Sequence, residues 1–199
     1  MKILITGGSG LLGGRLANYL SRNNDITLLS RKKIDHLFNN QHIYTHTYTS
    51  MNDLNEDFVT HNIIIHASGP NNNDCSNKNL VEKYIEETKY FINLSGYNKS
   101  TQKFIFLSSI RSIGENINGL ITEDSPYEPM TNYGVLKKRV EEYLISHRPK
   151  NNMAKIILRL TNGYGYPAHA LSDCWNLVVM NICKQAIISG KITLKSDGS

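Results

Sequence analysis

The sequence predicts an α/β domain built on a doubly wound parallel sheet with helices on both of its faces. Short apolar runs alternate with longer segments whose apolar residues recur at helical spacing, which is typical of repeated βαβ units. The 199 residues suffice for one domain with a substantial core and the beginning of a second. With 40% hydrophobic and 20% charged residues, the composition is that of a globular protein rather than a disordered one.

Each expected element follows from this alternation. Strands are predicted at Lys2–Thr6, Ile26–Leu29, Ile43–Thr47, Ile63–His66, Lys103–Leu107 and Lys155–Leu160. The third of these has the weakest pattern, because residues 36–60 are polar and rich in Asn, Thr and His. Helices are predicted at Leu11–Ser21, Leu80–Leu94 and Tyr133–Ser146, each with apolar residues along one side.

The basic balance of the chain favours small anionic ligands over nucleic acid. The formal net charge is +5, yet Lys and Arg are scattered, whereas a nucleic-acid-binding surface usually needs a clustered basic face. A dinucleotide or a sugar diphosphate suits a mildly basic protein, and a solvated surface with no ligand is the alternative.

The remaining composition excludes several other classes of protein. The three cysteines are odd in number and widely spaced, and the histidines lack metal-ligand spacing, so we expect neither a disulfide framework nor a metal site. No apolar segment approaches the ~20 residues that span a bilayer, and the N-terminal apolar run is too short for a signal peptide. We therefore expect a cytoplasmic protein without a membrane segment.

A glycine-rich turn follows the first predicted strand and opens the first helix. Gly7, Gly10 and Gly13 form a GxxGxxG pattern, with Leu11 and Leu12 at the start of the helix. Such a turn lets a pyrophosphate approach the backbone, and the helix N-terminus supplies unpaired N–H donors and a partial positive charge. A tight turn without a ligand is the alternative, but the position after a strand favours a Rossmann domain that binds NAD(P).

The end of the second predicted strand bears on the choice of cofactor. An NAD-binding Rossmann domain usually has an acidic residue there for the ribose 2′-hydroxyl, but this chain has Ser30 followed by Arg31. A hydroxyl and a guanidinium suit a 2′-phosphate, and Arg15 in the first helix is a further candidate. We therefore expect NADP in preference to NAD; the alternative is a solvated basic loop without selectivity.

Three further residues form a candidate catalytic group. Tyr133 and Lys137 are four residues apart at the start of a predicted helix, so they share one face. An ammonium and a positively charged nicotinamide nearby would lower the pKa of the phenol and let Tyr133 exchange a proton with a substrate hydroxyl. Ser109, after the fifth strand, could bond the same hydroxyl. An ordinary helix pair is the alternative for Tyr133 and Lys137.

Taken together, the ordered motifs resemble the extended short-chain dehydrogenases, the NAD-dependent epimerase/dehydratase family. They are TGGSGLLGG at 6–14, His66-Ala67-Ser68, FLSSIRSIG at 106–114, ITEDSP at 121–126, YGVLK at 133–137 and LRLTNGYG at 158–165. The resemblance implies a Rossmann domain over 1–165, with catalytic Ser109, Tyr133 and Lys137. It also implies cofactor contacts at Ala67 and Ser68, and a substrate contact at Asn162 beside Ser109.

The expected substrate is a nucleotide-activated sugar, with hydride transfer at a sugar carbon. Members that remove water from a hexose resemble one another in an Asp-Glu pair after the serine, where this chain has Ile110 and Arg111. Dehydration is therefore disfavoured, which leaves epimerisation or reduction of a keto sugar. Two other family positions differ, since Tyr84 stands near an expected asparagine and Leu136 replaces a serine.

The C-terminal part of the chain is shorter than the resemblance implies. Residues 166–199 would form only the start of a substrate-binding lobe that usually continues for on the order of 100 residues. The chain is then either a fragment of a longer enzyme or a dinucleotide-binding module with impaired catalysis. The family also implies a role in polysaccharide biosynthesis and a homodimer formed by the helices at 80–94 and 133–146, although their apolar stripes could equally pack on the sheet.

Overall fold

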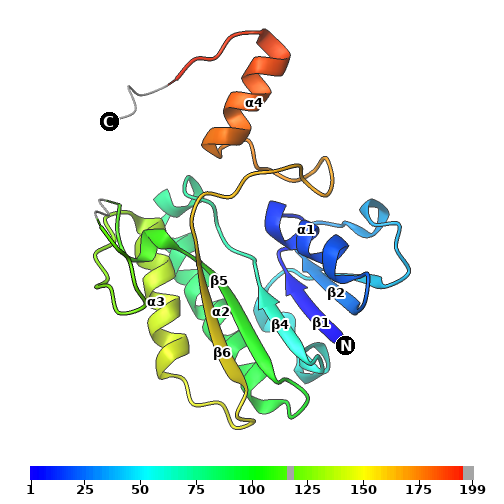
Figure 1. Ribbon diagram of the computed structural model, residues 1–199. Coiled ribbons are helices and arrows are strands. Elements are labelled where there is room, and N and C mark those ends of the chain that lie inside the picture. Colours follow the sequence, from blue (N-terminus) through cyan, green and yellow to red (C-terminus); the bar gives the residue numbers. More distant parts are fainter. Residues whose placement is uncertain (116–118, 195–199) are drawn as a thin grey trace.

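The computed structural model describes residues 1–115 and 119–194 of the chain (Figure 1). Six parallel strands form one sheet: β1 (Lys2–Thr6), β2 (Asp25–Ser30), β3 (Ile43–Thr47), β4 (Ile63–His66), β5 (Lys103–Ser109) and β6 (Ala154–Leu160). The α-helices are α1 (Leu11–Leu20), α2 (Lys78–Tyr97), α3 (Asn132–Ser146) and α4 (Val178–Ser189). This is the predicted α/β architecture.

The strand order β3-β2-β1-β4-β5-β6 makes the sheet doubly wound. The chain runs outward from β1 to β3, returns to the centre, and then runs outward through β4, β5 and β6. In an open parallel sheet of this kind, ligands bind beyond the carboxyl ends of the strands at the point where the order reverses. Here that point lies between β1 and β4, which pair from Ile3 with Ile63 to Thr6 with His66.

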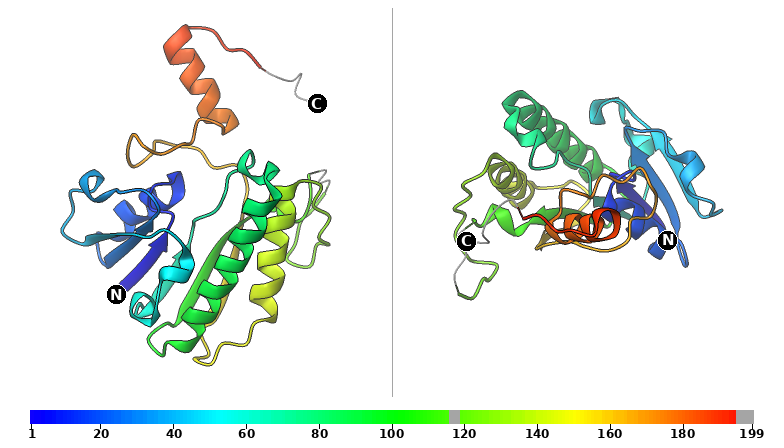
Figure 2. Two further views of the ribbon diagram at one scale, coloured as in Figure 1. Left: turned by 180° about the vertical axis from the view of Figure 1, so that it is seen from behind. Right: turned by 90° about the horizontal axis from the view of Figure 1, so that it is seen from above.

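Helices cover both faces of the sheet because side chains alternate along each strand. On one face, α2 and α3 lie side by side over buried Leu4, Ile64, Phe104 and Phe106 (Figure 2, left). On the other face, α1 packs on β1 and β2 over Ile3, Ile5, Ile26 and Leu28. The apolar stripes of α2 and α3 therefore pack on their own sheet, which is the alternative to the dimer contact considered above.

The segment after β6 returns toward α1 before it enters α4. Arg15 donates a hydrogen bond through Nη1 to the Tyr164 carbonyl at 3.3 Å, and His169 Nε2 lies 3.3 Å from the Gly8 carbonyl oxygen. Helix α4 stands beyond the carboxyl end of the sheet, apart from the layered body (Figure 1). It presents exposed apolar side chains at Val178, Ile187 and Ile188.

The predicted elements differ from the observed ones mainly at their ends, whereas helix α4 was not predicted at all. Strand β5 extends through Ser109, so this serine is the last residue of the strand rather than one that follows it. The polar segment at 36–60 contains the predicted strand and short 3₁₀ turns, because Ser50 and Asn55 accept backbone N–H bonds as turn caps. Within the described ranges, no helix is long and apolar enough to cross a membrane.

Candidate active site

The glycine-rich turn joins β1 to α1 at the reversal point of the sheet. Gly7 has φ +75°, which favours glycine, and its carbonyl accepts the Gly10 N–H at 2.9 Å. A Cβ at Gly13 would overlap the Gly7 carbonyl oxygen, so the first turn of α1 can approach the strand only without a side chain there. The N-terminus of α1, with Gly10 as its N-cap residue, lines a cavity.

That cavity, of about 390 Å³, brings together most of the predicted site residues. The predicted residues that line it are Gly10, Leu11, Leu12, Gly13, Ala67, Ser68, Ser109, Tyr133, Lys137 and Asn162. They come from five segments of the chain: the glycine turn with the start of α1, the residues just after β4, the end of β5, the start of α3, and the loop after β6. A glycine turn, a helix N-terminus and this volume together fit the pyrophosphate and nicotinamide part of a dinucleotide.

The predicted catalytic group is assembled by close packing of α3 against the turn after β5. Thr131 caps α3 by accepting the Gly134 N–H at 3.2 Å, which places Tyr133 in the first helical turn. A Cβ at Gly134 would overlap the Arg111 carbonyl oxygen, so this glycine lets the helix contact the turn that follows Ser109. Tyr133 and Ser109 thus meet in the cavity although 24 positions separate them in the chain, from 109 to 133.

The electrostatics of this group follow mainly from burial. Burial raises the pKa of the Tyr133 phenol, and a hydrogen bond with Ser109 partly opposes that rise. In the chain without a cofactor the pKa of Tyr133 is therefore raised, whereas the sequence predicted that an ammonium and a nicotinamide nearby would lower it. Burial lowers the pKa of Lys137 to about 8, and its Nζ donates to the Leu107 carbonyl at 2.9 Å. The ammonium also lies 5.6 Å from the centre of the Tyr133 ring.

A buried polar network behind the cavity positions the end of β4. Thr6 Oγ1 accepts the backbone N–H groups of Ala67 and Ser68, each at 3.1 Å, and lies 3.0 Å from His66 Nδ1. On its other side the imidazole lies 3.1 Å from the hydroxyl of Tyr84, which donates to the Ser68 carbonyl at 2.8 Å. Burial lowers the pKa of His66 to about 3, so the ring is neutral. The sequence motif at 66–68 includes His66, but nothing in that motif predicts that the imidazole lies between the hydroxyls of Thr6 and Tyr84.

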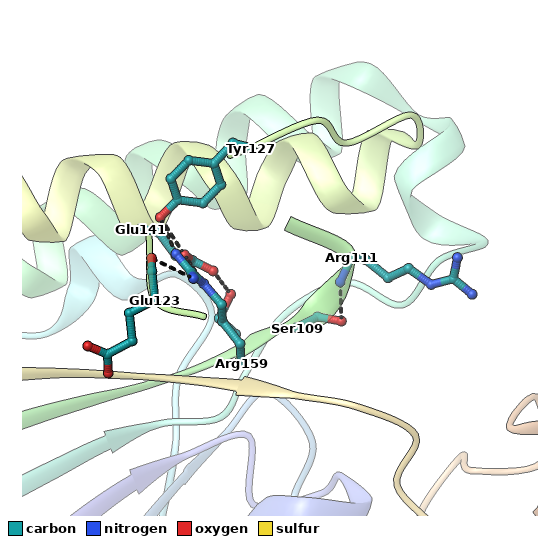
Figure 3. Close-up of polar contacts among 7 residues, drawn as sticks. Ser109, Arg111, Glu123, Tyr127, Glu141 and Arg159 are labelled. Atoms are coloured by element: carbon teal, nitrogen blue, oxygen red, sulfur yellow. Dashed lines mark hydrogen bonds and ion pairs between the residues drawn. The ribbon is translucent and has the colours of Figure 1, made fainter. Parts of the chain in front are cut away.

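A second buried cluster joins α3 to three other elements (Figure 3). The Glu141 carboxylate, one turn after Lys137, accepts from Ser108 Oγ, from the Tyr127 hydroxyl at 2.8 Å and from Arg159 Nε at 2.9 Å. Arg159 also donates to Tyr127 at 2.6 Å. Ser108 directly precedes Ser109 on β5, and Arg159 lies on β6. The cluster was not predicted, because the sequence gives no sign of which charges meet.

The residues predicted to select NADP are placed differently from one another. Ser30 is buried, and its hydroxyl accepts the Lys32 backbone N–H at 3.1 Å, so the side chain turns into its own loop. Arg31 lines a smaller cavity of about 190 Å³, which shares Ser68 with the first one. Arg15 points instead to Tyr164. Of these three residues, Arg31 is the one that lines a cavity next to the cavity of the glycine turn.

Beyond Ser109 and Tyr133 the site continues into a neighbouring cavity of about 540 Å³. Asn162, for which the family resemblance implies a substrate contact, lines both cavities. Arg111 also lines the second cavity, at a position noted in the sequence only for the carboxylate it lacks. Leu136, the other departure from the family pattern, is fully buried in the core under α3 and faces away from the site.

Comparisons with known proteins agree with this fold. The model of the NAD dependent epimerase/dehydratase family matches residues 3–199. Two Escherichia coli relatives are dTDP-glucose 4,6-dehydratase, 24% identical over 96% of this chain, and dTDP-4-dehydro-6-deoxyglucose reductase, 28% identical over 82% of it. A solved structure of UDP-glucuronic acid 4-epimerase from Bacillus cereus, with UDP-glucuronic acid and NAD, has a TM-score of 0.80 and 21% identity over 94% of this chain.

The chain spans about three fifths of the length of these relatives. The matches cover 61% of the dehydratase, 56% of the reductase and 63% of the Bacillus cereus chain. The structural likeness therefore concerns the Rossmann fold and the segment that follows it.

Proposed function

Since this chain belongs to the NAD-dependent epimerase/dehydratase family, we propose that it catalyses hydride transfer on a nucleotide-activated sugar, as an epimerase or a keto-sugar reductase. The observation that carries the proposal is the shared cavity, which Ser109, Tyr133 and Lys137 line together with the glycine turn. Relatives acting on dTDP- or UDP-activated sugars support the substrate class.

In this proposal Tyr133 holds and moves the proton of the reacting sugar hydroxyl. Ser109 orients that hydroxyl from the end of β5, and Lys137 supplies positive charge that favours the phenolate. A bound nicotinamide would accept and return the hydride. Because burial raises the pKa of Tyr133, the positive charges of Lys137 and of an oxidised nicotinamide are needed to lower that pKa toward neutral pH.

Epimerisation and reduction are preferred to dehydration. Elimination of water from a hexose needs an acid and a base beside the reacting carbons, whereas Ile110 and Arg111 follow Ser109 here. An epimerase recycles its own hydride, while a reductase consumes NADPH or NADH. Turnover that requires stoichiometric reduced cofactor would assign the chain to the reductases.

For the cofactor, we propose NADP in preference to NAD on the strength of Arg31. The Ser30 hydroxyl is buried and bonded within its own loop, so the preference depends on Arg31 alone; the compared structures of this fold contain NAD. Titration of the purified chain with NADPH and NADH, followed by nicotinamide fluorescence, tests the preference. We expect Arg31→Ala to weaken NADPH binding about tenfold and NADH binding little, because a charge-assisted bond to the 2′-phosphate is lost.

Replacing Tyr133 by Phe tests the catalytic assignment. We expect turnover to fall by a factor of about 100 or more, with unchanged cofactor affinity, because only the proton-transfer group is removed. Tyr143→Phe is the matched control: it lies on the same helix, but its hydroxyl bonds Asn93 at 2.7 Å outside the cavity. Turnover retained by Tyr133→Phe would refute the role of Tyr133. Cofactor binding without turnover in the unaltered chain would favour a dinucleotide-binding module.

Three further points complete the proposal. Residues 1–165 form the cofactor domain and 166–199 begin the substrate-binding lobe. A homodimer through α2 and α3 is testable by sedimentation, and a monomer at micromolar concentration would contradict it. From the proposed substrate class we also infer a role in polysaccharide biosynthesis in the cytoplasm.

A further inference from the structure

The cavity beyond the catalytic group has an uneven distribution of charge. Its polar lining consists largely of neutral groups, among them the side chains of Asn71, Asn72, Asn162 and Thr131. Among the described residues that line it, Arg111 alone carries a charge. Neutral amides and hydroxyls suit the hydroxyl groups of a sugar, but a guanidinium in such a wall favours an anionic ligand.

The guanidinium of Arg111 has no hydrogen-bond partner within residues 1–115 and 119–194. The arginine does act electrostatically on Glu115, whose pKa it helps to lower. Both oxygens of that carboxylate are already bonded, one to the Met130 N–H and one to the Thr131 hydroxyl, each at 2.7 Å. Figure 3 shows the Arg111 side chain pointing away from Glu141 and Arg159. Its donors are therefore available to a ligand.

The backbone of Arg111, in contrast, is held firmly beside the catalytic group. Its N–H donates to Ser109 Oγ at 3.3 Å, and its carbonyl packs against Gly134 in the first turn of α3. The Arg111 side chain therefore begins two residues after Ser109, and its backbone contacts Gly134, the residue next to Tyr133. An anion that it reaches lies near the reacting sugar ring rather than at the far end of a nucleotide.

We propose that Arg111 binds a carboxylate on the sugar itself, so that the preferred substrate is a nucleotide-activated uronic acid. The guanidinium fork matches the two oxygens of a carboxylate, and the neutral amides around it match the ring hydroxyls. The inference rests on the proposed function, since it concerns the substrate of the same site. The other anion that a nucleotide sugar offers is its diphosphate, and the experiment separates the two.

Isothermal titration of the full chain, saturated with its cofactor, tests the proposal. The probes are UDP-glucuronic acid, UDP-glucose and UDP, and the variants are Arg111→Gln and Arg111→Lys. Arg22→Gln is the matched control, because Arg22 is an exposed arginine just after α1, stacked over Tyr19. We expect the unaltered chain and the control to bind UDP-glucuronic acid about tenfold more tightly than UDP-glucose.

Arg111→Gln should abolish that difference in affinity by weakening only the binding of UDP-glucuronic acid. Arg111→Lys, which keeps the positive charge, should retain part of the difference. If Arg111→Gln weakens all three probes alike, the arginine binds the diphosphate and the proposal is wrong. No effect on any probe, or no binding of any probe by cofactor-loaded chain, would overturn it as well. Failure of the proposed function is seen separately, as absent cofactor binding or as turnover that survives Tyr133→Phe.

Discussion

Replacing Glu141 by Ala removes the centre of the buried cluster that joins α3 to β5, β6 and the loop carrying Tyr127. The carboxylate is fully buried, and the Arg159 side chain keeps only 17% of its surface exposed. Without Glu141, the Nε of Arg159, the Tyr127 hydroxyl and Ser108 Oγ lose their acceptor. The variant therefore leaves a largely buried positive charge without its counter-ion.

The size of the effect follows from that uncompensated charge. Breaking a buried ion pair by removing one partner costs about 3–5 kcal/mol. Arg159 retains its bonds to Tyr127 at 2.6 Å and to the Glu123 carbonyl at 3.3 Å, and it can be partly hydrated. We therefore expect the lower end, about 3 kcal/mol of unfolding free energy, which for a protein of this size is a fall in Tm of roughly 6–12 °C.

Urea and thermal unfolding followed by circular dichroism measure this loss. Glu142→Ala, the next residue on α3, is the control: its carboxylate is 53% exposed and 3.8 Å from Lys138, so its loss should cost less than about 1 kcal/mol. The double replacement Glu141→Leu with Arg159→Met should recover most of the stability, since it removes both charges. A Glu141→Ala protein as stable as the control would refute the reasoning.

Two other predictions concern the glycine turn and the buried histidine. Gly13→Ala should weaken cofactor binding at least about tenfold in the fluorescence titration, because the new Cβ overlaps the Gly7 carbonyl oxygen. Asn18→Ala, at an exposed position of α1, is the control and should leave cofactor binding unchanged. The pKa of His66 is about 3 in the folded chain and about 6.5 unfolded, so the unfolded state takes up the proton first. The contribution of His66 to the unfolding free energy should then be complete above pH 6.5 and decrease as the pH drops toward 3. A His66→Gln protein should lose less unfolding free energy between pH 7 and pH 4 than the unaltered chain. An equal loss in the two proteins would contradict this account.

Much of the fold could be predicted because its signals are short-range. Apolar runs and helical stripes are read within a few residues, and their alternation limits the chain to parallel βαβ units. The glycine turn and the spacing of Tyr133 and Lys137 are likewise local, since one turn of backbone decides which side chains share a face. The sequence by itself therefore determined the fold class, the glycine-rich turn and the core of the candidate catalytic group.

Tertiary structure decided the contacts between residues far apart in the chain. Only the packing of α3 on the turn after β5 brings Ser109 to Tyr133, and only the strand order places Arg159 beside Glu141. It also turned the Ser30 hydroxyl into its own loop while leaving the Arg111 guanidinium in the cavity wall. The physical reason is that hydrophobic periodicity specifies which face of an element is buried, whereas the partner of a polar or charged group depends on which elements become neighbours.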